Sequence, residues 1–275
     1  MKTKKYKIVI FTELKDSLEN TLKSTLSLAK VFKGEIALFH VKKATDVVKK
    51  ESQLSAMRNL NAGYMEMEKQ INAIVNTYSK KFGVPLSYSC AIGNVKHEIE
   101  HYIDNEKPDF IVLGKRKPKL FNLLGDHIIP FVLKKHHGPV FFTDQKNVLE
   151  LNGDLSLGML SDSEENSLTE LVTRLVTHTQ KPLKSFKISK NSKPKSSEKE
   201  EIGTKNIEFV FDKNDNTSKT ISNYITFNKV NLLCVDRGEL NTDKKGKSFS
   251  TTTNITDILD NLNIPLLLTG QITKN

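Results

Sequence analysis

Residues 99–113 read IEHYIDNEKPDFIVL, and residues 221–235 read ISNYITFNKVNLLCV, at an offset of 122 positions (from 99 to 221). In each copy an Ile-x-x-Tyr-Ile stretch precedes a run of four apolar residues. The first part predicts an amphipathic helix and the second a buried strand. Because the unit occurs twice in 275 residues, and a domain takes roughly 150 residues, the sequence predicts two related domains.

Apolar strands alternate with helical patterns on both sides of the first copy. The expected strands lie near residues 7–12, 35–41, 85–91, 109–113 and 140–143. The segments between them carry apolar residues at helical spacing, most clearly over the long stretch 52–82. The resulting order, five strands separated by four helices, predicts a parallel sheet with helices on its faces.

The second half repeats this order with a deletion. Thr12-Glu13 matches Ser161-Asp162 at an offset of 149, against 122 downstream, so 27 residues are missing. The loss removes the long second helix, and the polar stretch 190–203 in its place is expected to be mobile because it has no apolar period. We expect domains at 1–145 and 146–275, the second of them truncated.

The charge of the chain is basic and is concentrated in its first half. The net charge is +10, of which residues 1–145 contribute +9 (24 basic and 15 acidic side chains). A basic half attracts nucleic acid or phosphate. The aromatic residues, however, lie on apolar stripes instead of alternating with basic residues on an exposed face, so nucleic acid is not an expected partner.

The same reading predicts a cytoplasmic protein. No apolar run approaches the roughly 18 residues needed to cross a bilayer, and no signal-peptide core follows the N-terminus. Cys90 and Cys234 each lie in an apolar or strand-like run. This predicts that both are free thiols that pack in the core of a protein in a reducing compartment, and that they do not form a disulfide. We therefore expect no membrane partner.

Three stretches resemble the universal stress protein family. Residues 12–20 (TELKDSLEN) are similar to the family's opening Thr-Asp-Phe-Ser-x-x-Ser-x-Asn-Ala, and Ile92-Gly93-Asn94 is similar to its Gly-Asp/Asn-Pro segment after the third strand. Residues 109–114 (DFIVLG) match the fourth strand. The resemblance covers nearly the whole chain and is strongest over residues 5–145.

This resemblance implies the α/β fold in detail. Each domain would be a doubly wound, five-stranded parallel sheet of the flavodoxin-like and adenine nucleotide alpha hydrolase-like type, with strand order 3-2-1-4-5. Domains of the family pair through their fifth strands. Here those strands would be residues 139–143 (PVFFT) and 265–269 (PLLLT), so the two halves of one chain are expected to form a pseudo-dimer. The tandem unit could also pair further as a homodimer.

Part of the family binds ATP through Gly-x2-Gly-x9-Gly-Ser/Thr after the fourth strand, where glycines let backbone N–H groups approach the phosphates. Only Gly114 is kept here. Lys117 stands at the position of the second glycine of this pattern, and His127 stands at the position of the third. The glycine nearest to the third position is Gly125, two residues earlier in the chain, and Asp126 follows it where the family has a hydroxyl residue. A carboxylate repels a phosphate, so the departures predict a decayed nucleotide site.

A second interpretation keeps the first-domain cleft as a binding site for ATP, AMP or another phosphorylated small molecule. Its candidate residues are Thr12, Glu13, Val41, Gly93, Gly114, Lys115, Arg116, Gly125 and Asp126. Lys115 and Arg116 would hold an anion by charge, whereas Glu13 extends further into the cleft than the family's Asp. In the second domain Asp236 stands where the first has Gly114, so that domain is expected to be nucleotide-free.

Other patterns favour no catalytic or metal site. His97 and His101 have the i, i+4 spacing of metal ligands but lack a third ligand nearby. His40 ends a strand beside the cleft, where it could touch a ligand or be a hydrogen-bonded core residue. The methionines 57, 65 and 67 indicate core or subunit packing. We expect a non-enzymatic stress-response or regulatory module that acts by association, or alternatively a nucleotide sensor.

Overall fold

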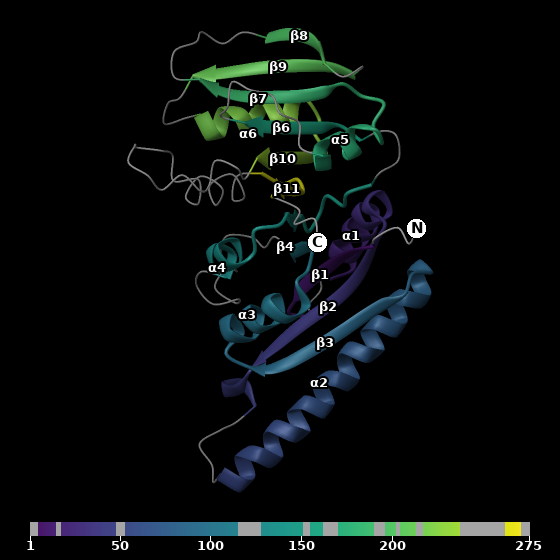
Figure 1. The fold of residues 1–275 in the computed structure, drawn as a ribbon, viewed down its shortest axis with the longest axis vertical. Helices are drawn as coiled ribbons and strands as arrows, with labels where there is room; N and C mark the ends of the chain where they lie inside the picture. Colours follow the sequence, from purple (N-terminus) through teal and green to yellow (C-terminus); the bar gives the residue numbers. More distant parts are fainter. Residues whose placement is uncertain are drawn as a thin grey trace.

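The computed structural model describes residues 5–14, 18–47, 53–114, 128–150, 155–161, 170–189, 196–201, 204–212, 217–236 and 262–270 (Figure 1). The first half contains β1 (Tyr6–Thr12), α1 (Leu18–Phe32), β2 (Gly34–Lys43), the short 3-10 helix η1 (Ala44–Asp46), α2 (Gln53–Phe82), β3 (Leu86–Gly93), α3 (Val95–Glu106), β4 (Phe110–Gly114), α4 (Ile128–Lys135) and β5 (Val140–Thr143). The second half contains β6 (Leu157–Ser161), α5 (Glu170–Val176), β7 (Leu183–Ser189), β8 (Ser196–Glu201), β9 (Thr204–Asp212), α6 (Thr217–Phe227), β10 (Leu232–Asp236) and β11 (Leu266–Thr269).

All described strands form one sheet of 11 strands in the order β3-β2-β1-β4-β5-β11-β10-β6-β7-β9-β8. The first five strands are parallel neighbours in the predicted order 3-2-1-4-5. In the second half β9-β7-β6-β10-β11 repeat that order. The predicted fold class, a doubly wound α/β sheet present twice, is confirmed.

Helices cover both faces of the sheet, as a parallel sheet requires. Alternate residues of a strand point to opposite faces, and β1 shows this directly. Ile8 and Ile10 pack in one apolar layer with α1, α2 and α5, whereas Val9 and Phe11 pack in the other with α3, α4 and α6. Both layers run through the two halves of the chain.

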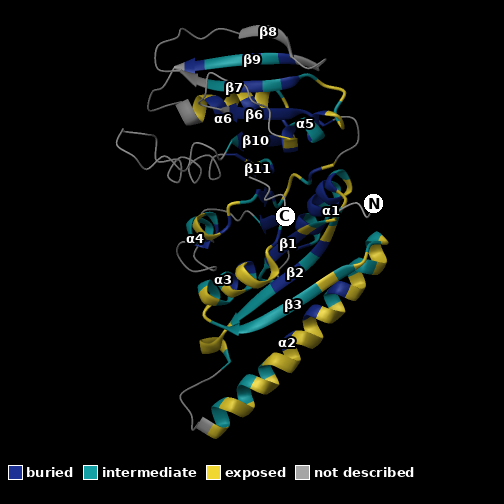
Figure 2. Cartoon of the chain, in the orientation of Figure 1, coloured by how far each residue is buried: buried dark blue, intermediate teal, exposed yellow. Residues whose placement is uncertain are grey.

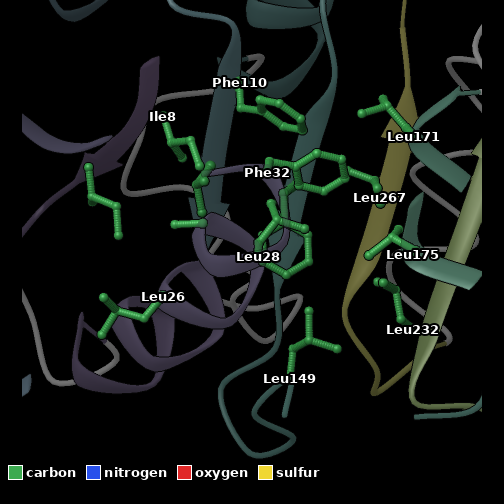
Figure 3. Packing of buried hydrophobic residues seen from close by; sticks show 14 of the residues in the cluster. Ile8, Leu26, Leu28, Phe32, Phe110, Leu149, Leu171, Leu175, Leu232 and Leu267 are labelled. Carbon is green, nitrogen blue, oxygen red and sulfur yellow. The ribbon is translucent and has the colours of Figure 1, made fainter. Parts of the chain in front are cut away.

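The two halves join through their fifth strands. β5 pairs with β11 in antiparallel register, with Phe141 opposite Leu267 and both side chains fully buried. Around this junction Phe110 and Phe32 of the first half lie near Leu171 of the second (Figure 3). The predicted pairing of fifth strands within one chain is therefore present in the structure.

The connection between the halves is held against α1. The Asn20 side chain donates a hydrogen bond to the Gln145 carbonyl at 2.6 Å, and the Ser24 hydroxyl accepts one from the Leu149 backbone N–H at 3.0 Å. Leu149 is buried in the apolar layer. Asn20, the asparagine of the family-like opening stretch, thus anchors the chain that leaves β5.

One expectation about the second half is wrong. The stretch 190–203 was expected to be mobile, but its described residues 196–201 form strand β8, antiparallel to β9. Parallel strands start at the same edge, so the chain must return between β7 and β9, and β8 makes that return where α2 makes it in the first half. Backbone pairing here overrides the low strand propensity of Glu and Lys side chains.

A surface ion-pair group ties α2 to α1. The Glu19 carboxylate accepts hydrogen bonds from Lys81 at 2.8 Å and lies 2.9 Å from Lys23. The Lys81 hydrogen bond, followed by that of Lys23, lowers the pKa of Glu19 from 4.5 to about 2. A carboxyl whose pKa is lower in the folded protein contributes stability above its unfolded pKa and loses it as the pH falls through the folded value.

The Glu19→Gln variant is therefore expected to be less stable than the parent at about pH 6, with the difference shrinking between about pH 4.5 and pH 2. Urea unfolding of both proteins across this range measures the difference. The Glu66→Gln variant, which changes an exposed carboxyl of α2 whose side-chain partner is the neutral Gln70, is the charge-matched control. A difference between Glu19→Gln and the parent that is independent of pH would contradict the assignment.

Candidate functional site

A cavity of about 350 Å³ opens at the carboxyl ends of β1 and β2. In open parallel sheets this edge is where ligands bind. The cavity is lined by Phe11, Thr12, Glu13, Phe39, His40, Val41, Lys42, Lys43, Asp46, Met67, Gln70, Val95 and Ile99. Its walls therefore come from two strands, the 3-10 helix η1, the middle of α2 and the start of α3. This lining mixes both signs of charge with apolar side chains.

The structure brings together only part of the predicted residue set. Thr12, Glu13 and Val41 line the cavity. Gly93 and Gly114 end the strands β3 and β4 at the same edge of the sheet but are not among the lining residues. The remaining four candidates, Lys115, Arg116, Gly125 and Asp126, lie outside the described residues. The binding set as a whole stays a prediction.

Thr12 shapes the chain where it leaves β1. Its Oγ1 accepts a hydrogen bond from the Leu14 backbone N–H at 3.0 Å. Leu14 has a φ of 58°, in the left-handed region that costs a residue with a side chain roughly 1–2 kcal/mol. The hydroxyl thus stabilises a strained turn at the cavity mouth, and it keeps its O–H as a donor.

His40 bridges the ends of β1 and β2. Its Nδ1 lies 2.8 Å from the Thr12 carbonyl oxygen, and because a carbonyl only accepts, Nδ1 carries the proton. Burial lowers the pKa of His40, against the opposing effects of the Thr12 hydrogen bond and of nearby Glu13. The neutral ring keeps Nε2 as an acceptor. The sequence indicated that His40 ends a strand beside the cleft. In the structure His40 lines the cavity, and its Nδ1 is hydrogen-bonded to the Thr12 carbonyl.

Gly93 packs against a carboxylate. An added Cβ would lie 2.5 Å from Glu98 Oε1, so the Glu98 side chain fills the space beside this glycine. Asn94 caps α3 by accepting hydrogen bonds from the backbone N–H groups of Lys96 at 3.0 Å and His97 at 3.3 Å. A helix N-terminus attracts anions, and here the protein's own Glu98 lies in the first turn. A ligand phosphate would have to displace it.

Gly114 contacts a buried hydroxyl pair. Thr21 Oγ1 and Thr143 Oγ1 are 3.0 Å apart, and a Cβ on Gly114 would lie 3.3 Å from the first of them. Gly114 is the register partner of Thr143. The glycine thus gives the threonine pair room, and this packing role would favour glycine at position 114 even without a ligand.

The second half differs at the equivalent position. Asp236 ends β10 and is the register partner of Thr269, just as Gly114 is of Thr143. Thr269 Oγ1 donates hydrogen bonds to Asp236 Oδ1 at 3.4 Å and to the Val235 carbonyl at 3.3 Å. A carboxylate held by the protein thus occupies the strand end where the first half has a glycine.

The remaining candidates have local partners. His97 Nδ1 lies 3.4 Å from Glu98 Oε1, and the His101 ring bonds the Asn105 amide at 3.0 Å. Within the described ranges, no three His, Cys, Asp or Glu residues gather as metal ligands would. Both cysteines are free thiols, and burial raises the pKa of Cys234 to about 12. None of the helices in the described part of the chain has the length and apolar character of a membrane span.

No protein-family model matches this chain, and no curated protein matches its sequence. Solved structures do match. A universal stress protein from Archaeoglobus fulgidus DSM 4304 is 13% identical, covers 98% of this chain and 97% of its own, and has a TM-score of 0.67. A protein of unknown function from Pseudomonas aeruginosa PAO1 is 13% identical, covers 96% and 92%, and has a TM-score of 0.53. Over both halves, this chain shares the fold of a solved universal stress protein.

Proposed function

We propose that this chain is a non-catalytic stress-response or regulatory module of the universal stress protein type, which acts by association in the cytoplasm and whose nucleotide site has decayed. The tandem fold supports the class of protein. The observation that carries the decayed site is a carboxylate at the ligand-binding edge of each half, Glu98 beside Gly93 in the first half and Asp236 beside Thr269 in the second.

These carboxylates disfavour a bound polyphosphate. Two like charges about 4 Å apart repel by ~1 kcal/mol in water and by ~4 kcal/mol near a protein surface. A nucleotide bound in either half would bring several negative charges to the edge that carries the carboxylate of that half. The carboxylates also already have local partners or neighbours in the protein, so binding would disturb existing packing as well as bring like charges together.

The non-catalytic assignment rests on the groups around the cavity. His40 is the natural candidate for a general base, but its Nδ1 is hydrogen-bonded to a backbone carbonyl instead of orienting a carboxylate or nucleophile. The Thr12 hydroxyl accepts from the Leu14 backbone. A nucleophile needs a neighbouring base within hydrogen-bond reach, and the contacts made by these two residues do not form such a pair.

The test is isothermal titration of the full chain with ATP, ADP and AMP, with and without Mg²⁺. We expect no binding heat up to about 1 mM ligand, which excludes dissociation constants below roughly 100 µM. The Arg116→Ala variant is titrated in parallel. Heat from the parent that weakens in this variant would overturn the decayed site and favour retained anion binding.

A second candidate function is a sensor for a phosphorylated small molecule, and the cavity itself favours it. A volume of about 350 Å³ is near the lower end for ligand pockets, so it suits a nucleoside-sized group better than a whole ATP. Lys42 and Lys43 supply positive charge at its rim. If AMP binds, the Lys42→Ala/Lys43→Ala variant is expected to bind at least about tenfold more weakly.

A further inference from the structure

The outer edge of β3 is an open strand edge. In the sheet order β3 is terminal, and among the described strands it pairs with β2 alone. Its eight residues, Leu86–Gly93 (LSYSCAIG), include no charged side chain. An edge strand presents a row of N–H and C=O groups that can pair with another strand. The β3 edge therefore has the chemistry of a strand-pairing site.

The opposite edge of the sheet is different. There β8 (SSEKEE) carries four charged residues in six. Natural sheets protect their edges against pairing with charges, proline or bulges. One edge of this sheet is therefore protected and the other is not, although both are terminal in the same molecule.

Helix α2 adds an apolar surface beside β3. Its exposed apolar side chains are Leu54 (73% exposed), Met57 (64%), Tyr64 (41%) and Met65 (71%). Figure 2 shows exposed residues along much of α2. At 3.6 residues per turn these apolar side chains fall within an arc of roughly 100°. Apolar side chains gathered on one arc mark an interaction surface, whereas scattered ones do not.

The arc continues the buried stripe of α2, because Met57 and the buried Val75 lie about five helical turns apart, and it is exposed where the helix extends past β3 (Figure 1). On the inner flank of α2, Gln70 lines the cavity over β1 and β2, and Lys81 bonds Glu19 of α1. Tyr64 lies roughly 120° around the helix from Gln70, and its side chain lies near Cys90 of the edge strand, against which α2 packs. The exposed apolar arc and the open strand edge therefore lie at the same end of the molecule, where α2 runs along β3 and its N-terminal turns extend past the end of that strand (Figure 1).

We propose that this surface, the outer edge of β3 with Leu54, Met57, Tyr64 and Met65 of α2, joins two copies of this chain about a two-fold axis. β3 of one copy pairs antiparallel with β3 of the other, and the two α2 helices pack side by side. The proposal does not depend on the proposed nucleotide chemistry.

Several observations favour a second copy as the occupant. Self-pairing sets an uncharged strand against an uncharged strand, so no like charges are opposed across the ladder. A two-fold contact also closes on itself, whereas pairing β3 with β8 of another copy would build an open filament. The chain already uses the same kind of junction internally, where β5 and β11 pair antiparallel between two parallel half-sheets. That junction leaves β3 as the uncharged edge for a further contact.

The surface is large enough for a dimer of modest affinity. The four exposed apolar side chains present on the order of 500 Å² per copy, so pairing would bury about 1,000 Å², the lower bound of a specific interface. Backbone hydrogen bonds along β3 would add to this. We therefore expect a dissociation constant in the range of about 1–20 µM.

Sedimentation equilibrium of the full chain between about 1 and 200 µM tests the proposal. Two variants change the surface at exposed positions, Met57→Glu/Met65→Glu on α2 and Ser87→Lys on β3. Each is expected to raise the dissociation constant at least 30-fold, by about 2 kcal/mol of lost association. The matched control is Phe227→Glu, on α6 in the other half, where the side chain is 86% exposed.

A parent protein that stays monomeric at the highest concentration would overturn the proposal. A dimer that survives both surface variants would overturn it as well, as would one that Phe227→Glu weakens equally. Circular dichroism of each variant checks that the chain remains folded. Dimerisation lost in both surface variants and kept in the control supports the assigned surface, whatever the nucleotide titration shows.

Discussion

Replacing Phe141 by alanine is expected to destabilise the protein by about 3–5 kcal/mol, one of the two largest effects that we predict. Phe141 is fully buried in β5, and its register partner across the junction is Leu267 of β11, also fully buried. The substitution opens a cavity in an apolar layer that both halves share. Urea unfolding followed by circular dichroism measures the loss.

Leu267→Ala tests the same junction from the other side, with an expected loss of about 2–5 kcal/mol. Because the two side chains belong to one packed layer, the double variant is expected to lose less than the sum of the two losses. Phe227→Ala, at an exposed position, is the control and should change stability by no more than about 0.5 kcal/mol. A junction variant as stable as this control would show that the halves do not rely on their contact.

The second large effect is expected at Phe110, the first residue of β4. Its buried ring lies 5.1 Å from that of Phe32 on α1 and 5.8 Å from that of Tyr6 on β1. Phe110→Ala is expected to cost about 3–5 kcal/mol, since it removes both buried area and aromatic contacts. Thermal and urea unfolding report this loss.

Phe110→Leu separates the two contributions, because leucine keeps most of the volume but none of the ring contacts. A double-mutant cycle with Phe32→Leu is expected to give a coupling energy of about 0.5–1.5 kcal/mol. A coupling near zero would contradict a specific ring–ring contribution and leave burial alone as the cause.

The sequence predicted the strands and their arrangement well, and the reasons are physical. Residues 110–113 and 232–235 are continuous apolar runs, and in the structure every one of them is buried inside a parallel sheet. The duplicated unit indicated two halves of the same topology. The strand order and the pairing of the fifth strands followed from the family resemblance. The order of the strands in the sheet confirms the first, and the β5–β11 ladder confirms the second.

β8 could not be predicted from local pattern. Residues 196–201 (SSEKEE) have neither apolar alternation nor strand-forming side chains. What makes them a strand is backbone pairing with β9, from Ser196 opposite Phe209 to Glu201 opposite Thr204. Such pairing depends on a neighbour in space, which side-chain propensities do not encode.

The candidate site was predicted in part. Thr12, Glu13 and Val41 follow from their positions at strand ends, because the carboxyl edge of such a sheet is known from topology. Gln70 and Asp46, which also line the cavity, come from a long helix and a short 3-10 turn whose placement depends on tertiary packing. The Glu98 carboxylate beside Gly93 likewise depends on a side-chain position that the sequence does not specify.

The methionines of α2 show the same limit on a smaller scale. The sequence grouped the methionines at 57, 65 and 67 as core or subunit packing. In the structure Met67 is buried, whereas the other two are exposed. Two residues along a helix turn a side chain by roughly 200°, so neighbours in sequence can face the core and the solvent. The helical period alone does not say where the buried face ends.

The covalent link between the halves changes how their contact responds to protein abundance. Two separate chains that met through strands like β5 and β11 would dissociate as a cell diluted them. Within one polypeptide, a partner tethered by a short connection is present at an effective concentration on the order of millimolar. The paired state is thus independent of expression level, so each half can accumulate substitutions such as Asp236 without having to remain compatible with a copy of itself.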